Sequence, residues 1–175
     1  MPSWRHLWHL VRRFVGSLWP WGPSRADEAW AATCLVPGEV ALWRRMSAAD
    51  RRHAVSVARR TERELGPRAT RPVLAAALLH DVGKVSAGFG PVRRSVATVA
   101  AMAWGHEAAV RWRERPGLVG RAGRYLCHDD IGSGMLDLAG SDGLTVAWAR
   151  EHHLPADRWT VPADIATALK LADDD

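Results

Sequence analysis

Several residue types are scarce in this sequence of 175 residues, and cysteine is the most informative of them. The two cysteines, Cys34 and Cys127, each stand alone in their segment. They can form neither a CxxC motif nor a disulfide framework, so a cysteine-based zinc ribbon and a disulfide-rich secreted scaffold are both excluded. We therefore expect a reducing compartment, the cytoplasm, for this chain.

Long apolar runs and strand patterns are also lacking. The longest apolar run, Val96–Trp104, is interrupted by Thr98 and is roughly half as long as a bilayer crossing requires. The first residues do not have the apolar core and cleavage site of a signal peptide. Valine, isoleucine and threonine nowhere alternate cleanly with polar residues. With 47% hydrophobic residues, the sequence predicts one all-α domain with its own core.

Lysine is nearly absent, although the formal net charge is +5. Lys84 and Lys170 are the only lysines, and the basic residues are otherwise arginines that alternate with acids instead of forming one block. This pattern is more typical of a solvated surface of mixed charge than of a nucleic-acid interface, so there is no strong nucleic-acid signal.

Residues 1–27 differ in composition from residues 28–175, and we treat them as a separate N-terminal segment. Tryptophan, leucine and valine recur at helical spacing between residues 4 and 19, with arginines among them, before a Pro- and Gly-containing break. This pattern predicts an amphipathic helix. The segment carries few charges for a lipid-binding face, so docking on the domain itself, or on a second copy in a homo-oligomer, is favoured over peripheral membrane contact.

The remainder predicts a bundle of helices. Ser47 followed by Asp50 resembles a capping box at the start of a helix that ends at Gly66-Pro67. A segment that is apolar all round, Val73–His80, predicts a central buried helix. The other expected helices are Asp27–Leu35, Glu39–Met46, Arg93–Arg115, Val119–His128, Ile131–Ala139, Asp142–His153 and Ala163–Ala172.

The central observation concerns His80 and Asp81, two ionisable residues at the end of that apolar helix. Burial of an unpaired carboxylate destabilises a fold by roughly several kcal/mol, so a cation must lie against Asp81. A metal ion would satisfy both side chains. The alternative is that Asp81 caps a neighbouring segment or pairs with an arginine.

Other candidate ligands occur in the surrounding helices, and their convergence would favour the metal. They are His53, His128, His152, His153 and Asp173. Helix-borne ligands that converge inside a bundle are a known way to build a metal site, and mixed imidazole and carboxylate ligands suit Mn, Fe, Co, Ni or Zn. His128 and His152 could instead satisfy helix C-termini. The apolar residues before Asp173 favour it over Asp174 and Asp175 as the buried acid.

The order His53, His80-Asp81 and Asp173, with the sequence AALLHDVGK at residues 76–84, resembles the HD-domain superfamily of metal-dependent phosphohydrolases. The resemblance covers about residues 37–175. It implies a helical bundle in which these four residues bind one metal ion.

A closer resemblance, to the HD-GYP phosphodiesterases, is partial. The sequence YLCHDDIG at residues 125–132 and the pair His152-His153 match that subfamily's additional histidines, which implies that His128, His152 and His153 supply the ligands of a further ion. The Gly-Tyr-Pro motif itself is missing, so hydrolysis of cyclic dinucleotides is not expected. Because neighbouring helical residues point about 100° apart, only one of His152 and His153 is expected to reach the metal. His152 is favoured for that position, and His153 would then contact substrate.

The resemblance and the predicted metal site imply a hydrolase that uses a metal-activated water. Its substrate would be a phosphate ester or anhydride, such as a nucleotide or a related phosphodiester. Asp81 would orient that water, and Lys84 would hold a phosphate oxygen as a point charge. Arg93 could close on the same phosphate. The alternative is a regulatory module that binds nucleotides or partners without turnover.

Overall fold

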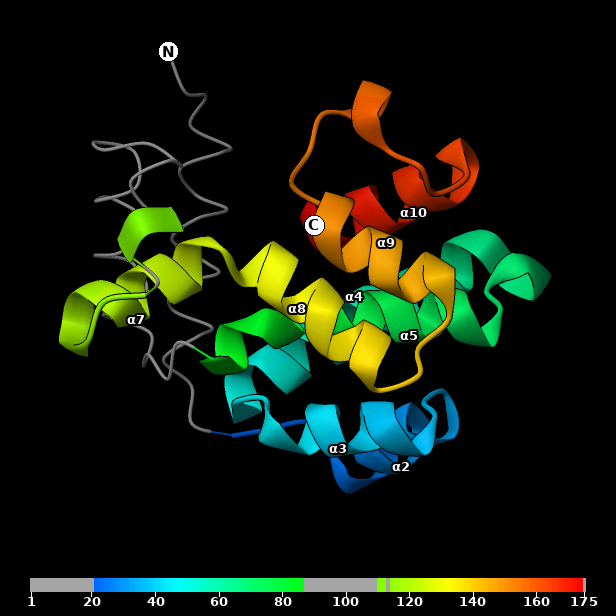
Figure 1. Cartoon of the computed structure of the whole chain (residues 1–175). Coiled ribbons are helices and arrows are strands. Elements are labelled where there is room, and N and C mark those ends of the chain that lie inside the picture. Colours follow the sequence, from blue (N-terminus) through cyan, green and yellow to red (C-terminus); the bar gives the residue numbers. More distant parts are fainter. Residues whose placement is uncertain (1–20, 87–109, 113, 175) are drawn as a thin grey trace, which may run out of the picture.

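The computed structural model describes residues 21–86, 110–112 and 114–174 of the chain. These residues form α-helices and short 3₁₀ turns and contain no strand (Figure 1). The expectation of an all-α fold is thereby confirmed.

The observed helices agree with the expected ones to within a few residues at each end. They are α2 (Arg25–Thr33), α3 (Pro37–Arg45), α4 (Ala48–Leu65), α5 (Arg71–Leu79), α7 (Gly117–Leu126), α8 (His128–Leu138), α9 (Gly143–Glu151) and α10 (Ala163–Asp174), with short 3₁₀ turns η1 (Gly66–Arg68), η2 (Val82–Ser86) and η3 (Ala156–Arg158).

Local capping explains where several of these helices begin and end. The Ser47 hydroxyl accepts a hydrogen bond from the Asp50 amide at 3.2 Å, as the capping-box pattern predicts. Ser24 caps α2 in the same way, so this helix begins before the expected Asp27. Helix α4 ends at Leu65, and its C-cap residue Gly66 has a φ of +52°, a conformation that favours glycine.

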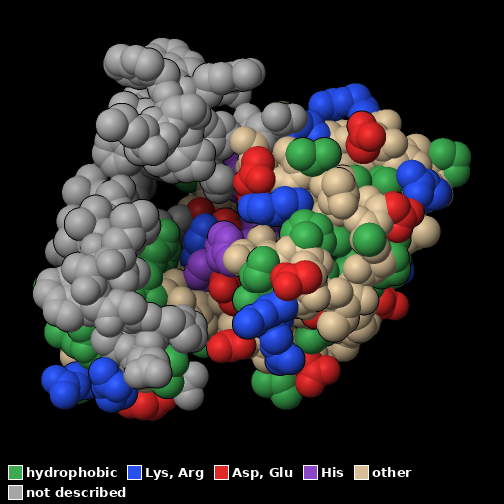
Figure 2. Space-filling view, turned by 90° about the horizontal axis from the view of Figure 1, so that it is seen from above, with side chains coloured by type: hydrophobic (Ala, Val, Ile, Leu, Met, Phe, Trp, Pro, Cys, Tyr) green, Lys and Arg blue, Asp and Glu red, His purple; other side chains and the backbone are tan. Residues whose placement is uncertain are grey.

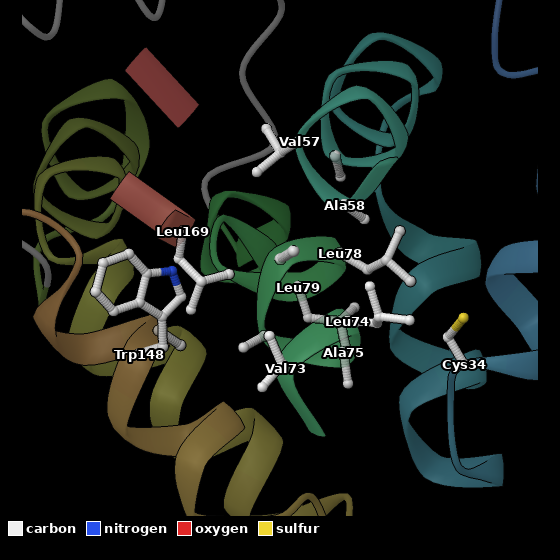
Figure 3. Packing of buried hydrophobic residues seen from close by; sticks show 14 of the residues in the cluster. Cys34, Val57, Ala58, Val73, Leu74, Ala75, Leu78, Leu79, Trp148 and Leu169 are labelled. Carbon is white, nitrogen blue, oxygen red and sulfur yellow. The ribbon is translucent and has the colours of Figure 1, made fainter. Parts of the chain in front are cut away.

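Helix α5 lies at the centre of the core, as its apolar sequence predicts. Its residues from Val73 to Leu79 are all buried, and α4 and α9 pack along its sides. Figure 3 shows Leu78 between α5 and α4, and Trp148 of α9 facing Leu169 of α10. Burial of each such leucine contributes roughly 1.5–3 kcal/mol, so the position of the C-terminal end of α5 is fixed by the core.

The remaining helices surround α5. Helix α10 packs on α4, and α8 packs on α9 and on η2. In the view of Figure 1, α2 and α3 lie on one side of α4 and α5, while α9 and α10 lie on the other. The residues after the end of α5 are therefore enclosed by the ends of several other helices.

Some expectations lie outside the described residues. These are the amphipathic helix at residues 4–19, most of the helix expected at Arg93–Arg115, and Arg93 itself. Docking of residues 4–19, membrane contact and a homo-oligomer stay predictions, as does the division after residue 27. Within the part of the chain that is described, no helix combines the length and the apolar character needed to span a bilayer.

Candidate metal centre

Five helices bring the predicted ligands together at one place. His53 comes from α4, His80 and Asp81 follow α5, His128 begins α8, His152 and His153 follow α9, and Asp173 lies in the last turn of α10. Because α5 is buried from Val73 to Leu79, its C-terminal end lies inside the bundle, where Asp81 is only 5% exposed. The sequence positions span more than a hundred residues, but the side chains form one cluster.

The first group of possible ligands consists of His53, His80 and Asp173. The Oδ1 atom of Asp173 lies 2.9 Å from Nε2 of His53 and 3.6 Å from Nε2 of His80. Asp173 is buried, whereas Asp174 is exposed and forms an ion pair with Lys170. The structure therefore places Asp173 toward the histidines, as the apolar residues before it indicated.

The second group consists of Asp81, His128, His152 and His153. The Oδ1 atom of Asp81 lies 3.3 Å from Nε2 of His128 and 3.8 Å from Nε2 of His152. The two groups adjoin, since Nε2 of His80 is 3.5 Å from Oδ2 of Asp81. Asp81 thus lies between the two sets of imidazoles.

The spacing between these atoms fits metal coordination. Two ligand atoms that are each about 2.1 Å from one ion are about 3.0 Å apart at a right angle and about 3.4 Å apart at the tetrahedral angle. The separations of 3.3 Å between Asp81 and His128 and 3.6 Å between Asp173 and His80 are close to these values. Small movements of side chains would allow each group to hold a metal ion.

The hydrogen bonds of the imidazoles are also suited to metal coordination. The Nδ1 atoms of His80, His128 and His152 lie 2.9, 2.8 and 3.1 Å from the carbonyl oxygens of Ala77, Tyr125 and Ala149. A carbonyl oxygen only accepts, so each Nδ1 carries the proton and donates it, which leaves Nε2 available to a metal.

The Nε2 atoms of these three histidines, and Oδ1 of Asp81, are buried and have no hydrogen-bond partner within the described residues. Unsatisfied buried polar atoms are uncommon in proteins, and each is destabilising by roughly 1–3 kcal/mol. Four of them face one another here. Divalent transition metals held by the two adjoining groups would satisfy all four with ligand types that such ions prefer, so the residues present fit such ions.

Lys84 contacts this cluster directly, because its ammonium group donates a hydrogen bond to Oδ2 of Asp81. Burial disfavours the charged form of Asp81, but the Lys84 ammonium and the ring of His80 outweigh it and hold the pKa of Asp81 well below its usual range. Burial likewise opposes the charge on Lys84, and Asp81 keeps the pKa of Lys84 above its usual value. Asp81 is therefore ionised, with one oxygen fixed by Lys84.

The pKa values of two buried histidines of the second group, His128 and His152, are shifted in opposite directions. Burial lowers the pKa of His152 to about 3, and the rings of His80 and His153 act in the same direction. Burial alone would also lower the pKa of His128, but the carboxylates of Asp129 and Asp81 raise it to about 9. His152 is thus neutral near pH 7, while His128 takes up a proton in the metal-free protein.

A contact between α4 and α10 holds the helical turn that carries Asp173. Both Nε and Nη2 of Arg60 donate hydrogen bonds to the carbonyl oxygen of Ala172, at 2.8 and 2.6 Å. This carbonyl lies in the last turn of α10, where backbone acceptors lack partners within the helix. Arg60 therefore ties the end of α10 to the helix that carries His53.

A second set of contacts holds the turn that carries His152 and His153. The buried carboxylate of Glu151 accepts hydrogen bonds from the amide and the hydroxyl of Thr160, both at 2.6 Å. The indole of Trp159 donates to the carbonyl oxygen of Glu151 at 3.1 Å. The residues that follow the histidine pair are thereby folded back onto the end of α9.

His153 differs from the expectation that only one histidine of the pair would approach the metal ligands. Helix α9 ends at Glu151, so both histidines lie in the turn that follows, and their ring centroids are 4.0 Å apart. A ring nitrogen of His153 is close enough to Asp81, His128 and His152 to share an ion with them. The side chain of His153 is 48% exposed, so this edge of the cluster is open to solvent.

Figure 2 shows histidine side chains gathered on one face, with acidic and basic side chains beside them. Asp129 is a member of this cluster that the sequence reasoning missed. Its Oδ1 atom lies 2.9 Å from Nε2 of His128. The signal was present, because Asp129 directly follows a candidate ligand just as Asp81 follows His80.

The structure thus brings together His53, His80, Asp81, Lys84, His128, His152, His153 and Asp173, whereas Arg93 lies outside the described residues. The roles assigned to these residues stay predictions. The arrangement is that of a centre that could hold a metal ion. Comparisons with family models, with curated proteins and with solved structures found no match for this chain.

Proposed function

We propose that this chain is a metal-dependent phosphohydrolase of the HD type, which hydrolyses a phosphate ester or anhydride in a nucleotide or related phosphodiester. The observation that carries the proposal is the set of unpartnered Nε2 atoms of His80, His128 and His152 around the ionised Asp81, within the described residues. The order of His53, His80-Asp81 and Asp173 along the chain, which resembles that superfamily, also supports it.

The proposed ligands divide between two adjoining positions. His53, His80, Asp81 and Asp173 would hold one divalent transition metal, since His80 and Asp173 lie within 3.6 Å of each other and His80 and Asp81 within 3.5 Å. His128 and His152 would hold a second ion together with Asp81. The two oxygens of Asp81 face different neighbours, which suits a shared ligand.

The chemistry that such ions supply when bound is a lower pKa for a coordinated water and neutralisation of charge on phosphoryl oxygens. The chain's own residues provide orientation. Lys84 fixes one oxygen of Asp81 by a hydrogen bond, so the other oxygen keeps its direction toward His128 and His152. An ammonium has three N–H donors, and those that Asp81 does not take would contact the phosphate.

Substrate would approach from the exposed edge of the cluster. His153 has about half of its side chain exposed there, while His152 beside it is fully buried. His153 would therefore be the histidine that contacts the bound phosphate, and Lys84 would lie deeper. A contact between Arg93 and the same phosphate stays a prediction, because Arg93 lies outside the described residues.

The test is hydrolysis of an aryl phosphate monoester and of the corresponding diester by metal-depleted protein, before and after addition of Mn²⁺, Co²⁺, Ni²⁺ or Zn²⁺. Activity should require the metal and should be lost in Asp81→Asn. Asp137→Asn, which changes an exposed acid on α8, is the matched control and should retain activity. Full activity without metal, or in a folded Asp81→Asn variant, would refute the proposal.

The regulatory alternative gives a different result in the same experiment. A metal-loaded protein that melts at a higher temperature with a nucleotide present, and forms no product, would favour a binding module over an enzyme.

The comparison of the phosphate monoester with the diester also decides which class of phosphate compound the site hydrolyses.

A further inference from the structure

Asp129 lies in the first turn of α8, directly after His128, and it faces the second group of ligands. Its Oδ1 atom is 2.9 Å from Nε2 of His128 and 4.0 Å from Nε2 of His153. This atom is buried, although part of the Asp129 side chain reaches solvent, and it has no hydrogen-bond partner among the residues that the structure describes.

The neighbouring acid shows that this arrangement is not a general property of the helix N-terminus. Asp130 is in the same turn of α8, but its side chain is exposed and lies 3.8 Å from Arg150 in a surface ion pair. Of the two acids, only Asp129 faces imidazoles. The helix start alone would favour both acids equally, so the direction of Asp129 needs another explanation.

Charge balance gives that explanation. When the imidazoles of the second group are neutral, as metal binding requires, the negative charge of Asp81 is matched by the ammonium of Lys84. Without a further acid, this half of the cluster would have no net negative charge to attract a divalent cation. Asp129 supplies one negative charge at the side where His128 and His153 lie.

The spacing is also suitable for a shared ion. An oxygen and a nitrogen bound to one metal at about 2.1 Å are about 3.0 Å apart at a right angle. The separation between Asp129 and His128 is 2.9 Å, although the contact does not have the geometry of a hydrogen bond.

We propose that Asp129 is a further metal ligand, which binds an ion together with His128 at the solvent-facing edge of the cluster, beside the exposed side chain of His153. The inference rests on the proposed metal centre and adds a residue to it. The HD-GYP resemblance gives no role to an acid at position 129.

Titration of metal-depleted, full-length protein with Co²⁺, followed by calorimetry and by the visible absorption of the bound ion, tests the assignment. Loss of an outer hydrogen-bond partner weakens metal binding by about 10- to 100-fold, so loss of a ligand should exceed this range. Asp129→Asn should weaken one Co²⁺ site by more than about 100-fold or abolish it. Asp130→Asn, the matched control, should bind Co²⁺ as the wild type does.

A smaller effect of Asp129→Asn would overturn the assignment. If Asp129→Asn does not fold, as judged by its circular dichroism, the anomalous scattering of Zn²⁺ in crystals of the wild type decides instead. A peak within about 2.2 Å of an Asp129 oxygen supports the proposal, and peaks only elsewhere in the cluster refute it.

The two proposals fail in different ways. Wild-type protein that binds no Co²⁺ would remove the metal centre itself, and with it the proposed function. Wild-type protein that binds Co²⁺, with an equally good Asp129→Asn variant, would remove only the role of Asp129.

Discussion

The backbone of Gly83 touches the carbonyl oxygen of His128 so closely that a Cβ atom at position 83 would overlap it. Gly83 belongs to η2, the turn that carries Lys84, and His128 is the first residue of α8. This approach brings His128 next to Asp81. The absence of a side chain at Gly83 is therefore a condition for the second group of ligands to form.

Gly83→Ala should separate η2 from α8, because the added methyl group meets backbone atoms, which cannot rotate away. We expect a loss of about 1–3 kcal/mol of stability and weaker metal binding, measured by thermal melting with and without Zn²⁺. Gly134→Ala is the control on α8, since a Cβ atom there meets nothing within 4 Å. It should change stability by at most about 1 kcal/mol, in the stabilising direction. Equal behaviour of the two variants would contradict the close-approach argument.

Arg60 should affect stability and metal binding, because it holds the C-terminal end of α10. Arg60→Met keeps the apolar stem but removes both hydrogen bonds to the Ala172 carbonyl. We expect a loss of about 1–3 kcal/mol in the free energy of unfolding and weaker metal binding, because Asp173 is less well held. Arg63→Met changes an exposed arginine of the same helix and serves as the control. Unchanged unfolding and metal affinity in Arg60→Met would show that the contact does not position Asp173.

Metal affinity should rise with pH. The pKa of His128 is raised to about 9 in the metal-free protein, so below that pH the ring is protonated on both nitrogens. A metal can bind Nε2 only after this proton leaves, and each unit of pH between about 6.5 and 8.5 should therefore increase the apparent affinity about tenfold. His152 adds nothing to this slope, because its pKa of about 3 keeps it neutral.

Calorimetry in two buffers of different ionisation enthalpy measures the number of protons released when the metal binds. The account predicts the release of about one proton near pH 7.5. Binding without proton release, or an affinity that falls as pH rises, would show that His128 is not protonated in the free site or does not bind the ion.

The helices of the core could be predicted from the sequence, because their ends and their burial depend on residues close together in the sequence. The start of α4 follows from the Ser47 cap, and the burial of α5 follows from a run of apolar residues that no solvated helix would carry. From that burial, the enclosed position of His80 and Asp81 followed directly. The direction of Asp173 could also be predicted, because apolar residues precede it on the buried face of α10.

Other features depend on contacts between elements that are distant in the sequence. No pattern around position 83 shows that α8 must approach its backbone, and none around Arg60 shows that its partner is the Ala172 carbonyl. Lys84 was expected to hold phosphate, but its pairing with Asp81 depends on the turn that η2 makes after α5. Asp129 was missed because acids in the first turn of a helix usually need no further explanation.

The metal content of the purified protein tests the central claim most directly. Full-length protein prepared without chelator, or loaded with Zn²⁺ and passed through a desalting column, should retain roughly one or two ions per chain by elemental analysis. Asp81→Asn, with an unchanged circular dichroism spectrum, should retain far less. A folded wild-type protein that holds no metal after loading, or an Asp81→Asn variant that holds as much as the wild type, would contradict the account.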